Sequence, residues 1–270
     1  MACVARALKP PKRRIGARAP LRGEPPHGKR PPMNPIIVIP ARMASTRLPG
    51  KPLADIAGRP MIAWMVEIAR NAGAGPVLVA AAEDEVAEAA LQAGANVAMT
   101  DPELPSGSDR VHAALRAFDP AGRFDVAVNL QGDMPTMRAA DVARAVAVLE
   151  RGADIATLVS PSADADERDN PNVVKAIRAA DGRCLAFTRA PAPWGEGPIE
   201  RHVGIYVYRR DALTRFVAAP PSPLELREKL EQLRALEMGM SIYADAVDVF
   251  PKGVDSPADL DAARAILSAP

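Results

Sequence analysis

The stretch P-A-R-M-A-S-T-R-L-P-G-K-P, residues 40–52, decides how the rest of the sequence is interpreted. It follows four β-branched residues, Ile36 to Ile39, which predict a strand buried on both faces, as in a parallel sheet. Pro40 ends that strand, because proline has no N–H to donate to a neighbouring strand. The loop behind it carries two hydroxyls, one glycine, no acidic residue and three cations, which are Arg42, Arg47 and Lys51.

Burying three unpaired cations would be very costly, so this loop cannot pack into a core. One interpretation is an ordinary cationic surface loop. The one we favour is a binding site for a polyanion. At the carboxyl end of the first strand of an α/β sheet, the usual polyanion is the phosphate chain of a nucleotide.

The loop matches neither G-x-x-x-x-G-K-[ST] nor G-x-G-x-x-G, so it is not a generic phosphate loop. Instead, P-A-R-x-x-S-T-R-L-P-G-K-P-L resembles the opening motif of the sugar-nucleotide cytidylyltransferases, and among them the 3-deoxy-manno-octulosonate (KDO) cytidylyltransferase, or CMP-KDO synthetase, family. The resemblance spans residues 33–267 and includes several later motifs in the same order. It implies that Pro40, Ala41, Arg42, Ser45, Arg47 and Lys51 contact the nucleotide.

Length and composition fit one sizeable α/β domain with room for a small subdomain, because the chain has 270 residues, 48% of them apolar. No run approaches the roughly 18 uninterrupted apolar residues of a membrane span, so we expect no membrane association. Two cysteines, Cys3 and Cys184, offer neither a disulfide framework nor a metal-ligand spacing. A reducing cytoplasm fits this usage.

Charge is distributed unevenly along the chain. Residues 1–32 hold nine Lys or Arg and one acid, whereas the remaining residues hold 25 basic and 32 acidic side chains. With seven prolines and no apolar periodicity, this leader is expected to be disordered. The acidic remainder argues against nucleic acid as a partner.

Three interpretations of the leader compete: an arm for nucleic acid or a membrane surface, a targeting peptide, and sequence outside the natural protein. It lacks the apolar core of a secretory signal. We favour an upstream start-site artefact, because Met33 stands directly before the first strand, where the resembling family normally begins. Protein starting at Met33 should then fold and work as well as the full chain, and loss of activity on deleting residues 1–32 would contradict this.

Beyond the loop, apolar runs and helical stripes alternate in a βα rhythm. This rhythm predicts parallel strands joined by right-handed crossovers. Together with the resemblance, it predicts a doubly wound, mostly parallel α/β sheet of the nucleotide-diphospho-sugar transferase type. The expected helices cover 60–73, 83–93, 104–118 and 137–150, and the expected strands cover 77–81, 96–99, 124–130 and 154–160.

The later part of the chain departs from that rhythm. Residues 170–210, with strands at 184–187 and 203–208, are expected to form a small β-rich region that covers the substrate. A single helix is predicted over 222–238, with a stripe of four leucines facing inward, and a last helix over 258–267. The four leucines are Leu226, Leu230, Leu233 and Leu236.

The segment L-P-S-G-S-D-R, residues 104–110, opens one of the predicted helices. Ser106 and Asp109 have the spacing of a capping box, so plain capping is one explanation. In the resembling family this segment lines the base pocket, which would give Ser106, Gly107 and Arg110 contacts with the nucleotide. Arg110 would be the member whose cation reaches the ligand.

Two aspartates stand where the resemblance implies magnesium ligands. Asp133, in Gln131-Gly132-Asp133, follows the strongest internal strand, and ligands bind at the carboxyl tips of such strands. A carboxylate there suits Mg²⁺ beside a triphosphate, and the alternative is a helix cap. Met134 stands where the family has glutamate. Asp255, in the family-like G-V-D-S-P, would be the second ligand, although Asp255 or Ser256 before Pro257 is also a good helix start.

A third group of residues resembles the family's sugar site. A guanidinium can grip the carboxylate of a sugar acid, and imidazole, phenol and amide groups can bind its hydroxyls. Each of these residues could instead be an ordinary structural or solvated side chain. The implied sugar ligands are Gln131, which is also a nucleotide contact, and Arg189, His202, Tyr206, Glu231 and Gln232.

The resemblance therefore implies transfer of CMP from CTP to KDO, with release of pyrophosphate, for lipopolysaccharide biosynthesis. Asp133 and Asp255 would hold Mg²⁺, while Arg47 and Lys51 would act on the triphosphate during catalysis. A homodimer is implied as well. Two alternatives stay open: activation of another sugar acid, such as amino-KDO or a nonulosonic acid, and a regulatory protein that binds CTP without turnover. The short segment before Arg201 keeps the first one open.

Overall fold

The computed structural model describes residues 32–45 and 47–268. The predictions for the leader therefore lie, except at Pro32, outside the described residues, as does Thr46. Residues from Met33 onward form one compact unit. None of the helices in these ranges is long and apolar enough to cross a membrane.

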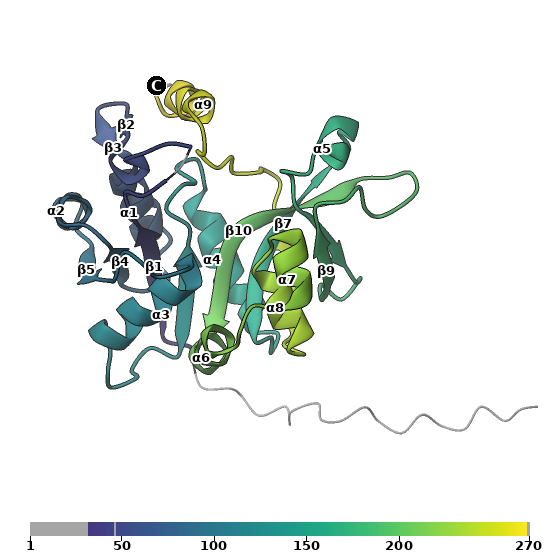
Figure 1. Cartoon of the computed structure of the whole chain (residues 1–270), viewed down its shortest axis with the longest axis horizontal. Helices are drawn as coiled ribbons and strands as arrows, with labels where there is room; N and C mark the ends of the chain where they lie inside the picture. The colour runs from purple at the N-terminus through teal and green to yellow at the C-terminus, as the bar shows by residue number, and fades with distance from the viewer. Residues whose placement is uncertain (1–31, 46, 269–270) are drawn as a thin grey trace, which may run out of the picture. The chain divides into compact units, whose positions relative to one another are not determined.

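One mixed sheet organises this unit, with strand order β11-β7-β10-β6-β1-β4-β5 (Figure 1). β1 pairs in parallel with both β4 and β6, and β4 with β5, whereas β10 runs antiparallel between β6 and β7. The predicted mostly parallel α/β sheet is confirmed. The main strands are β1 (Pro35–Ala41), β4 (Val77–Ala81), β5 (Asn96–Met99), β6 (Val126–Leu130), β7 (Ile155–Ser162), β10 (Ile199–Arg209) and β11 (Ile242–Ala246).

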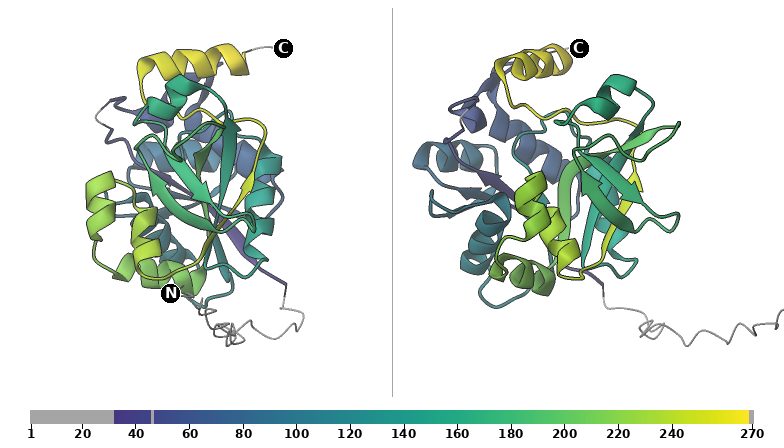
Figure 2. Two further views of the ribbon diagram at one scale, coloured as in Figure 1. Left: turned by 90° about the vertical axis from the view of Figure 1, so that its right-hand side faces the viewer. Right: turned by 45° about the vertical axis from the view of Figure 1, so that its right-hand side comes forward.

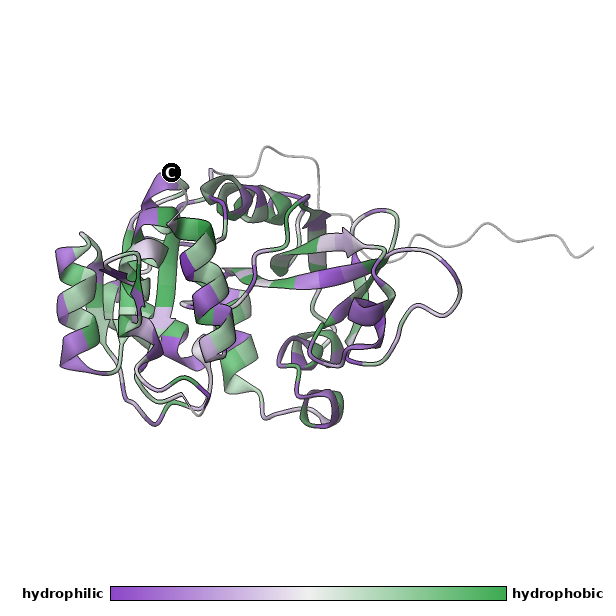
Figure 3. Cartoon of the chain, turned by 90° about the horizontal axis from the view of Figure 1, so that it is seen from above, coloured by the Kyte–Doolittle hydropathy of each residue, from purple (hydrophilic) through white to green (hydrophobic). Residues whose placement is uncertain are grey.

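Helices cover both faces of the sheet, as Figure 2 shows. On one face α1 (Met61–Asn71), α2 (Asp84–Gln92) and α4 (Ala139–Leu149) pack against Ile37 and Ile39 of β1. On the other face α3 (Gly107–Phe118), α6 (Arg210–Ala218) and α8 (Gln232–Glu237) pack against Ile36 and Val38. Figure 3 shows the matching hydrophobic stripes on the helices. The four β-branched residues are thus buried on both faces, as predicted.

Short elements complete the unit. A third apolar cluster joins β2, α1 and α9 around Ile56 and Met61. Trp64 is partly buried against this cluster and donates Nε1–H to the Ile56 carbonyl. The remaining elements are η1 (Lys51–Leu53), β2 (Asp55–Ile56), β3 (Arg59–Pro60), α5 (Ala165–Asp169), β8 (Lys175–Arg178), β9 (Cys184–Thr188), α7 (Pro223–Glu228) and α9 (Pro257–Leu267).

The predicted β-rich region needs correction at strand β10. Residues 203–208 were assigned to the small region, but they lie in the centre of the main sheet, paired on both sides. Only β8 and β9, together with the first residues of β10, project beyond it. The physical reason is length: β10 has 11 residues, enough to serve both regions.

The helix predicted over 222–238 is also wrong as a single element. It breaks at Lys229, whose φ of 54° and ψ of 48° are left-handed, so α7 and α8 are separate. Leu230 and Leu233 are buried as expected, but Leu226 is 65% exposed because α7 turns it to solvent. Elements α6 and β11 were not predicted at all.

This break leads to a stability prediction. A lysine in left-handed backbone costs about 1 kcal/mol relative to glycine, and the Lys229 side chain is exposed, so it contributes little packing. We expect Lys229→Gly to raise the free energy of unfolding by about 0.5–1 kcal/mol in urea titrations. The control Arg227→Gly, inside helical α7, should lower it by about 1 kcal/mol, and equal effects of the two variants would contradict the argument.

Candidate active site

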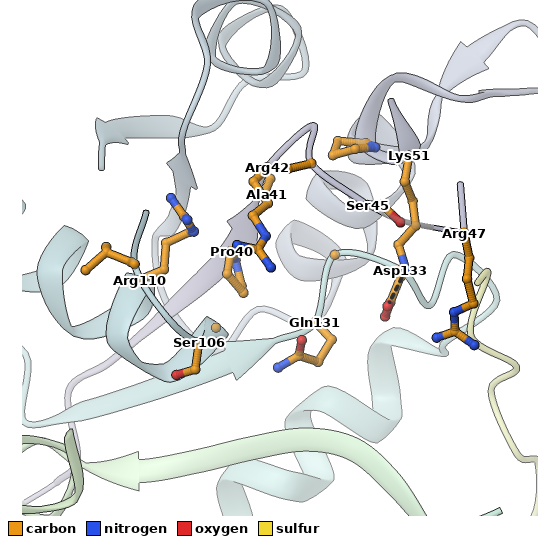
Figure 4. A pocket seen from close by; sticks show the side chains of 15 residues that line it. Pro40, Ala41, Arg42, Ser45, Arg47, Lys51, Ser106, Arg110, Gln131 and Asp133 are labelled. Carbon is orange, nitrogen blue, oxygen red and sulfur yellow. Dashed lines mark hydrogen bonds and ion pairs between the residues drawn. The ribbon is translucent and has the colours of Figure 1, made fainter. Parts of the chain in front are cut away.

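A cavity of about 660 Å³ opens where β1 and β6 end and α3 begins (Figure 4). All ten residues predicted to contact the nucleotide line it, and Asp133 does as well. Figure 4 shows Ser106 and Arg110 on one side, Arg47, Lys51 and Asp133 on the other, and Gln131 between them. One half of the cavity is thus cationic and the other is formed by the start of a helix.

Local backbone geometry shapes the cationic loop. Gly50 has φ 72°, a conformation that glycine adopts without steric cost, and its N–H bonds the Met43 carbonyl at 3.1 Å. The Met43 N–H in turn donates to a carboxylate oxygen of Glu83 at 2.9 Å. The loop therefore returns on itself and brings Lys51 to the cavity instead of extending into solvent.

Gly132 allows the two strand ends to meet. A Cβ on this residue would lie 2.9 Å from the Pro40 carbonyl oxygen, closer than real Cβ contacts. Beyond it, the Val254 N–H donates to the Asp133 carbonyl at 2.8 Å. This bond brings Asp255 beside Asp133, although the two residues lie far apart in the sequence.

The two aspartates share one ammonium group. Lys51 Nζ lies 2.7 Å from Asp133 Oδ2 and 3.0 Å from Asp255 Oδ1, and Arg47 Nη2 lies 3.1 Å from Asp255 Oδ2. Burial alone would lower the pKa of Lys51, but the two carboxylates outweigh burial and raise it. Lys51 therefore stays a cation at neutral pH.

The same geometry tests whether a divalent cation fits. Two carboxylates that bind one Nζ within 3.0 Å are close enough to bind one small metal ion. No group of three or more His, Cys, Asp or Glu side chains that could hold a metal ion occurs in residues 32–45 and 47–268, so this site offers a pair of carboxylates. Two protein oxygens suit Mg²⁺, which commonly takes its other ligands from phosphate and water.

Neither aspartate is used as a helix cap. α4 begins only at Ala139, so Asp133 caps nothing, and Ser256 forms the capping box of α9 with Asp259. Met134, which stands in place of the family's glutamate, is 4% exposed and packs in the core. Helix capping, the structural alternative for both aspartates, is therefore not their role in this fold.

At the helical end, Ser106 caps α3 by accepting the Asp109 N–H, so capping and cavity lining coincide in one residue. Arg110 differs from expectation. It is 2% exposed, and both of its Nη atoms donate to residues 100–102, at 2.6 Å to Thr100 Oγ1. These contacts hold a wall of the cavity rather than leave the cation free for a ligand.

His202 and Tyr206 lie next to each other on β10, with ring centroids 5.3 Å apart. Thr157 Oγ1 donates to the Ile205 carbonyl at 2.7 Å, so its lone pair accepts a hydrogen bond from His202 Nε2–H at 3.0 Å. Burial lowers the pKa of His202 to about 4, so the ring is neutral at pH 7. With Nε2 as the donor of this neutral ring, Nδ1 is an acceptor.

This burial predicts a pH dependence of stability. The unfolded chain protonates His202 below its ordinary pKa near 6.5, but the folded protein does so only near 4. Stability present above pH 6.5 should therefore fall by about 3 kcal/mol towards pH 4. We expect urea titrations at pH 7 and pH 4.5 to show a smaller loss in His202→Gln than in the wild type. Equal losses would contradict the assignment.

Glu231 and Gln232 begin α8 on the same side of the sheet. Glu231 Oε2 accepts from Ser108 Oγ at 2.9 Å, and Oε1 lies 3.7 Å from Arg234 Nη2. Among the described residues neither Oε1 nor Gln232 Nε2 has a hydrogen-bond partner. Burial raises the pKa of Glu231. Ser108 belongs to the segment 104–110 that was expected to line the base pocket, but it was not singled out as a site residue. Asn129 was not predicted, because a single polar residue inside the apolar run 126–130 carries no periodicity.

Arg189 is held by the backbone instead of facing the cavity. Its Nε donates to the Glu228 carbonyl at 2.8 Å and its Nη1 to the Pro171 carbonyl at 2.9 Å. Its own carbonyl accepts from the fully buried ammonium of Lys175. Arg189 does not line the cavity described above, and its contact with a sugar carboxylate stays a prediction.

Comparisons with known proteins agree with this geometry. A profile of the cytidylyltransferase family matches residues 36–242. The chain is 58% identical, over 87% of its length and 93% of the relative, to the 3-deoxy-manno-octulosonate cytidylyltransferase of Parvibaculum lavamentivorans. It is 57% identical to the enzyme of that name from Rhodospirillum centenum, over 87% of this chain and 94% of the other.

Solved structures give the same result. A CMP:2-keto-3-deoxy-manno-octonic acid synthetase complexed with CTP superposes with a TM-score of 0.81 at 36% identity, covering 87% of this chain and 98% of that one. A cytidylyltransferase from Leptospira borgpetersenii, 17% identical with a TM-score of 0.59 and 87% of each chain covered, shares the fold alone. By sequence and by fold, this chain belongs to the 3-deoxy-manno-octulosonate cytidylyltransferase family of nucleotidyltransferases.

Proposed function

We propose that this protein couples CTP to 3-deoxy-manno-octulosonate, forming CMP-KDO and pyrophosphate. The observation that carries the proposal is a cavity lined by a cationic loop and Asp133, with Asp255 converging on the same Lys51 ammonium. The high identity to relatives named for this reaction supports the choice of sugar acid and nucleotide.

The nucleotide would lie across the cavity. Its triphosphate faces Arg42, Arg47 and Lys51, because these are the cations lining the loop side. Arg42 and Arg47 are exposed and can follow the phosphates, whereas Lys51 is fixed between the aspartates. The base lies at the opposite end, against Ser106 and Gly107, where small residues and backbone groups can contact a pyrimidine edge.

Asp133 and Asp255 would hold Mg²⁺. When bound, the ion supplies a Lewis acid that lowers the pKa of the attacking hydroxyl and neutralises developing phosphate charge. The protein's own part is positional: the Val254–Asp133 backbone bond keeps the two carboxylates together. Arg47, beside Asp255, stays close enough to act on the same phosphate groups.

Transfer would follow an in-line displacement at the α-phosphorus. The anomeric hydroxyl oxygen of the sugar forms the new bond to phosphorus as the bond to the pyrophosphate oxygen breaks. Lys51 and Arg47 stabilise the departing pyrophosphate, because fixed cations at a developing charge lower the barrier. None of these steps requires a nucleophilic Ser, Cys or His.

The sugar would occupy the side of β6 and β10 that carries Gln131, Tyr206, Glu231 and Gln232. The neutral His202 offers Nδ1 as an acceptor for a hydroxyl. Arg189 would act from a distance, by holding the segments around Pro171 and Glu228. We further expect a homodimer in the cytoplasm, which light scattering and cell fractionation would test.

Pyrophosphate release tests the proposal directly. With CTP, Mg²⁺ and KDO, release should require all three components. Release with KDO no faster than with amino-KDO or a nonulosonic acid would favour another sugar acid. Binding of CTP without release for any sugar acid would favour the regulatory alternative.

A further inference from the structure

Three buried side-chain atoms lack a hydrogen-bond partner among the described residues, and their placement points to a ligand. They are Asn129 Nδ2, Glu231 Oε1 and Gln232 Nε2. A buried polar atom without a partner is costly and uncommon in a native protein. Glu231 Oε1 lies 3.7 Å from Arg234 Nη2, which offsets its charge, so the amide atoms of Asn129 and Gln232 are the ones that a ligand could satisfy.

Topology places Asn129 on the same side of the sheet as the other two. Within β6, Ala127 belongs to the core cluster shared with Leu230 and Leu233 at α8, and Asn129 follows two residues later on the same face. Its register partner on β10 is Tyr206. Asn129 therefore lies on the same face of the sheet as Leu230 and Leu233, which flank Glu231 and Gln232 in the sequence.

Asn129 also touches the cavity through its neighbour. Its Oδ1 accepts from Gln131 Nε2 at 3.2 Å, and Gln131 lines the cavity. Asn129 is 0% exposed, so solvent does not satisfy its remaining polar atom. If both amides were turned over, Asn129 Oδ1 would be left unpaired instead of Nδ2. A ligand hydroxyl could satisfy either atom, because a hydroxyl both donates and accepts.

We propose that Asn129 is a specificity-determining residue of the sugar half of the site, whose amide binds one hydroxyl of the sugar acid. This inference rests on the proposed function. Binding that hydroxyl satisfies the unpaired amide atom, and an analogue without it leaves the atom buried and unpaired. Such a site discriminates strongly against the missing hydroxyl.

The test is a thermodynamic cycle that combines the substitution Asn129→Ala with monodeoxy analogues of KDO. Each analogue lacks one hydroxyl other than the anomeric hydroxyl that attacks phosphorus. In the wild type, one analogue should lose about 10-fold or more in kcat/KM for the sugar, and Asn129→Ala should lose a similar factor with the intact sugar. In Asn129→Ala the same analogue should lower kcat/KM for the sugar by a much smaller factor, while KM for CTP stays near the wild-type value. A second variant, Asn129→Ser, covers the case in which alanine destabilises the strand.

Val128→Ala is the matched control, because its side chain is the neighbouring one on the opposite face. It should lower stability without changing the relative preference among analogues. Equal losses for every analogue in wild type and variant would overturn the inference, as would a wild type that tolerates all analogues. A rise in KM for CTP alone would also overturn it. If the wild type turns over no KDO at all, the proposed function itself fails. If it turns over KDO but shows none of these preferences, only the inference about Asn129 fails.

Discussion

Asp133→Asn should release pyrophosphate at least about 10²- to 10³-fold more slowly than the wild type, with an unchanged melting temperature. Asparagine keeps the shape of the side chain but removes one of the two charges that converge on the Lys51 ammonium. A site with one carboxylate would hold Mg²⁺ and the activated hydroxyl poorly. The fold should persist, because the Val254 N–H bonds the backbone of Asp133 and not its side chain.

Two measurements make this result specific. Pyrophosphate release at saturating CTP and KDO reports turnover, and Mn²⁺ titration followed by electron paramagnetic resonance reports metal affinity, which should fall. Asp261→Asn is the control, since its side chain is 74% exposed and, in the described part of the chain, pairs with Arg264 of the last helix. Near-wild-type turnover in Asp133→Asn would defeat the assignment of this residue.

The second large effect is expected for Lys51→Met, which should lose about 10²- to 10³-fold in kcat/KM for CTP. Methionine fills similar space without the charge, so neither the triphosphate nor the departing pyrophosphate meets a cation at this position. In the absence of nucleotide, the metal affinity of Lys51→Met should rise, whereas its activity with CTP falls. With Lys51 gone, only Arg47 offsets the two aspartates, and Mn²⁺ should bind more tightly than in the wild type.

The matched control for this change is Arg59→Met, which removes a cation paired with Glu67 away from the cavity. It should change neither kcat/KM for CTP nor Mn²⁺ affinity. Weaker Mn²⁺ binding in nucleotide-free Lys51→Met would show that the ammonium does not share the aspartates with metal. Undiminished kcat/KM would remove Lys51 from the catalytic group.

Sequence reasoning succeeded where local pattern and burial agree. The β-branched run of β1 and the βα rhythm through β7 were predictable, because each of these elements faces the same kind of neighbour along its length. It failed at β10, which is one long strand serving the main sheet and the β8–β9 region. It also failed at Lys229, where a single residue in left-handed backbone divides a helical pattern.

The candidate site divides in the same way. The ten residues predicted to contact the nucleotide line one cavity. Most of them belong to two short continuous segments, 40–51 and 106–110, so a local motif was enough to identify them. Arg110 and Arg189 carry the expected charge, but their guanidinium groups donate hydrogen bonds to backbone carbonyls and, in Arg110, also to the Thr100 hydroxyl. A sequence motif identifies which residue is cationic. The direction in which its long side chain points depends on hydrogen-bond partners that come from other segments.

By itself, the sequence determined the chemistry of this protein: a strand that must be buried, a loop too cationic to be buried, and acids at two later motifs. Only the tertiary structure decided that Asp133 and Asp255 share one ammonium, and that the buried amide nitrogen of Asn129 has no hydrogen-bond partner among the described residues. The reason is physical. Local patterns reflect each residue's own burial, but convergence depends on strand pairing and backbone hydrogen bonds between segments far apart in the chain.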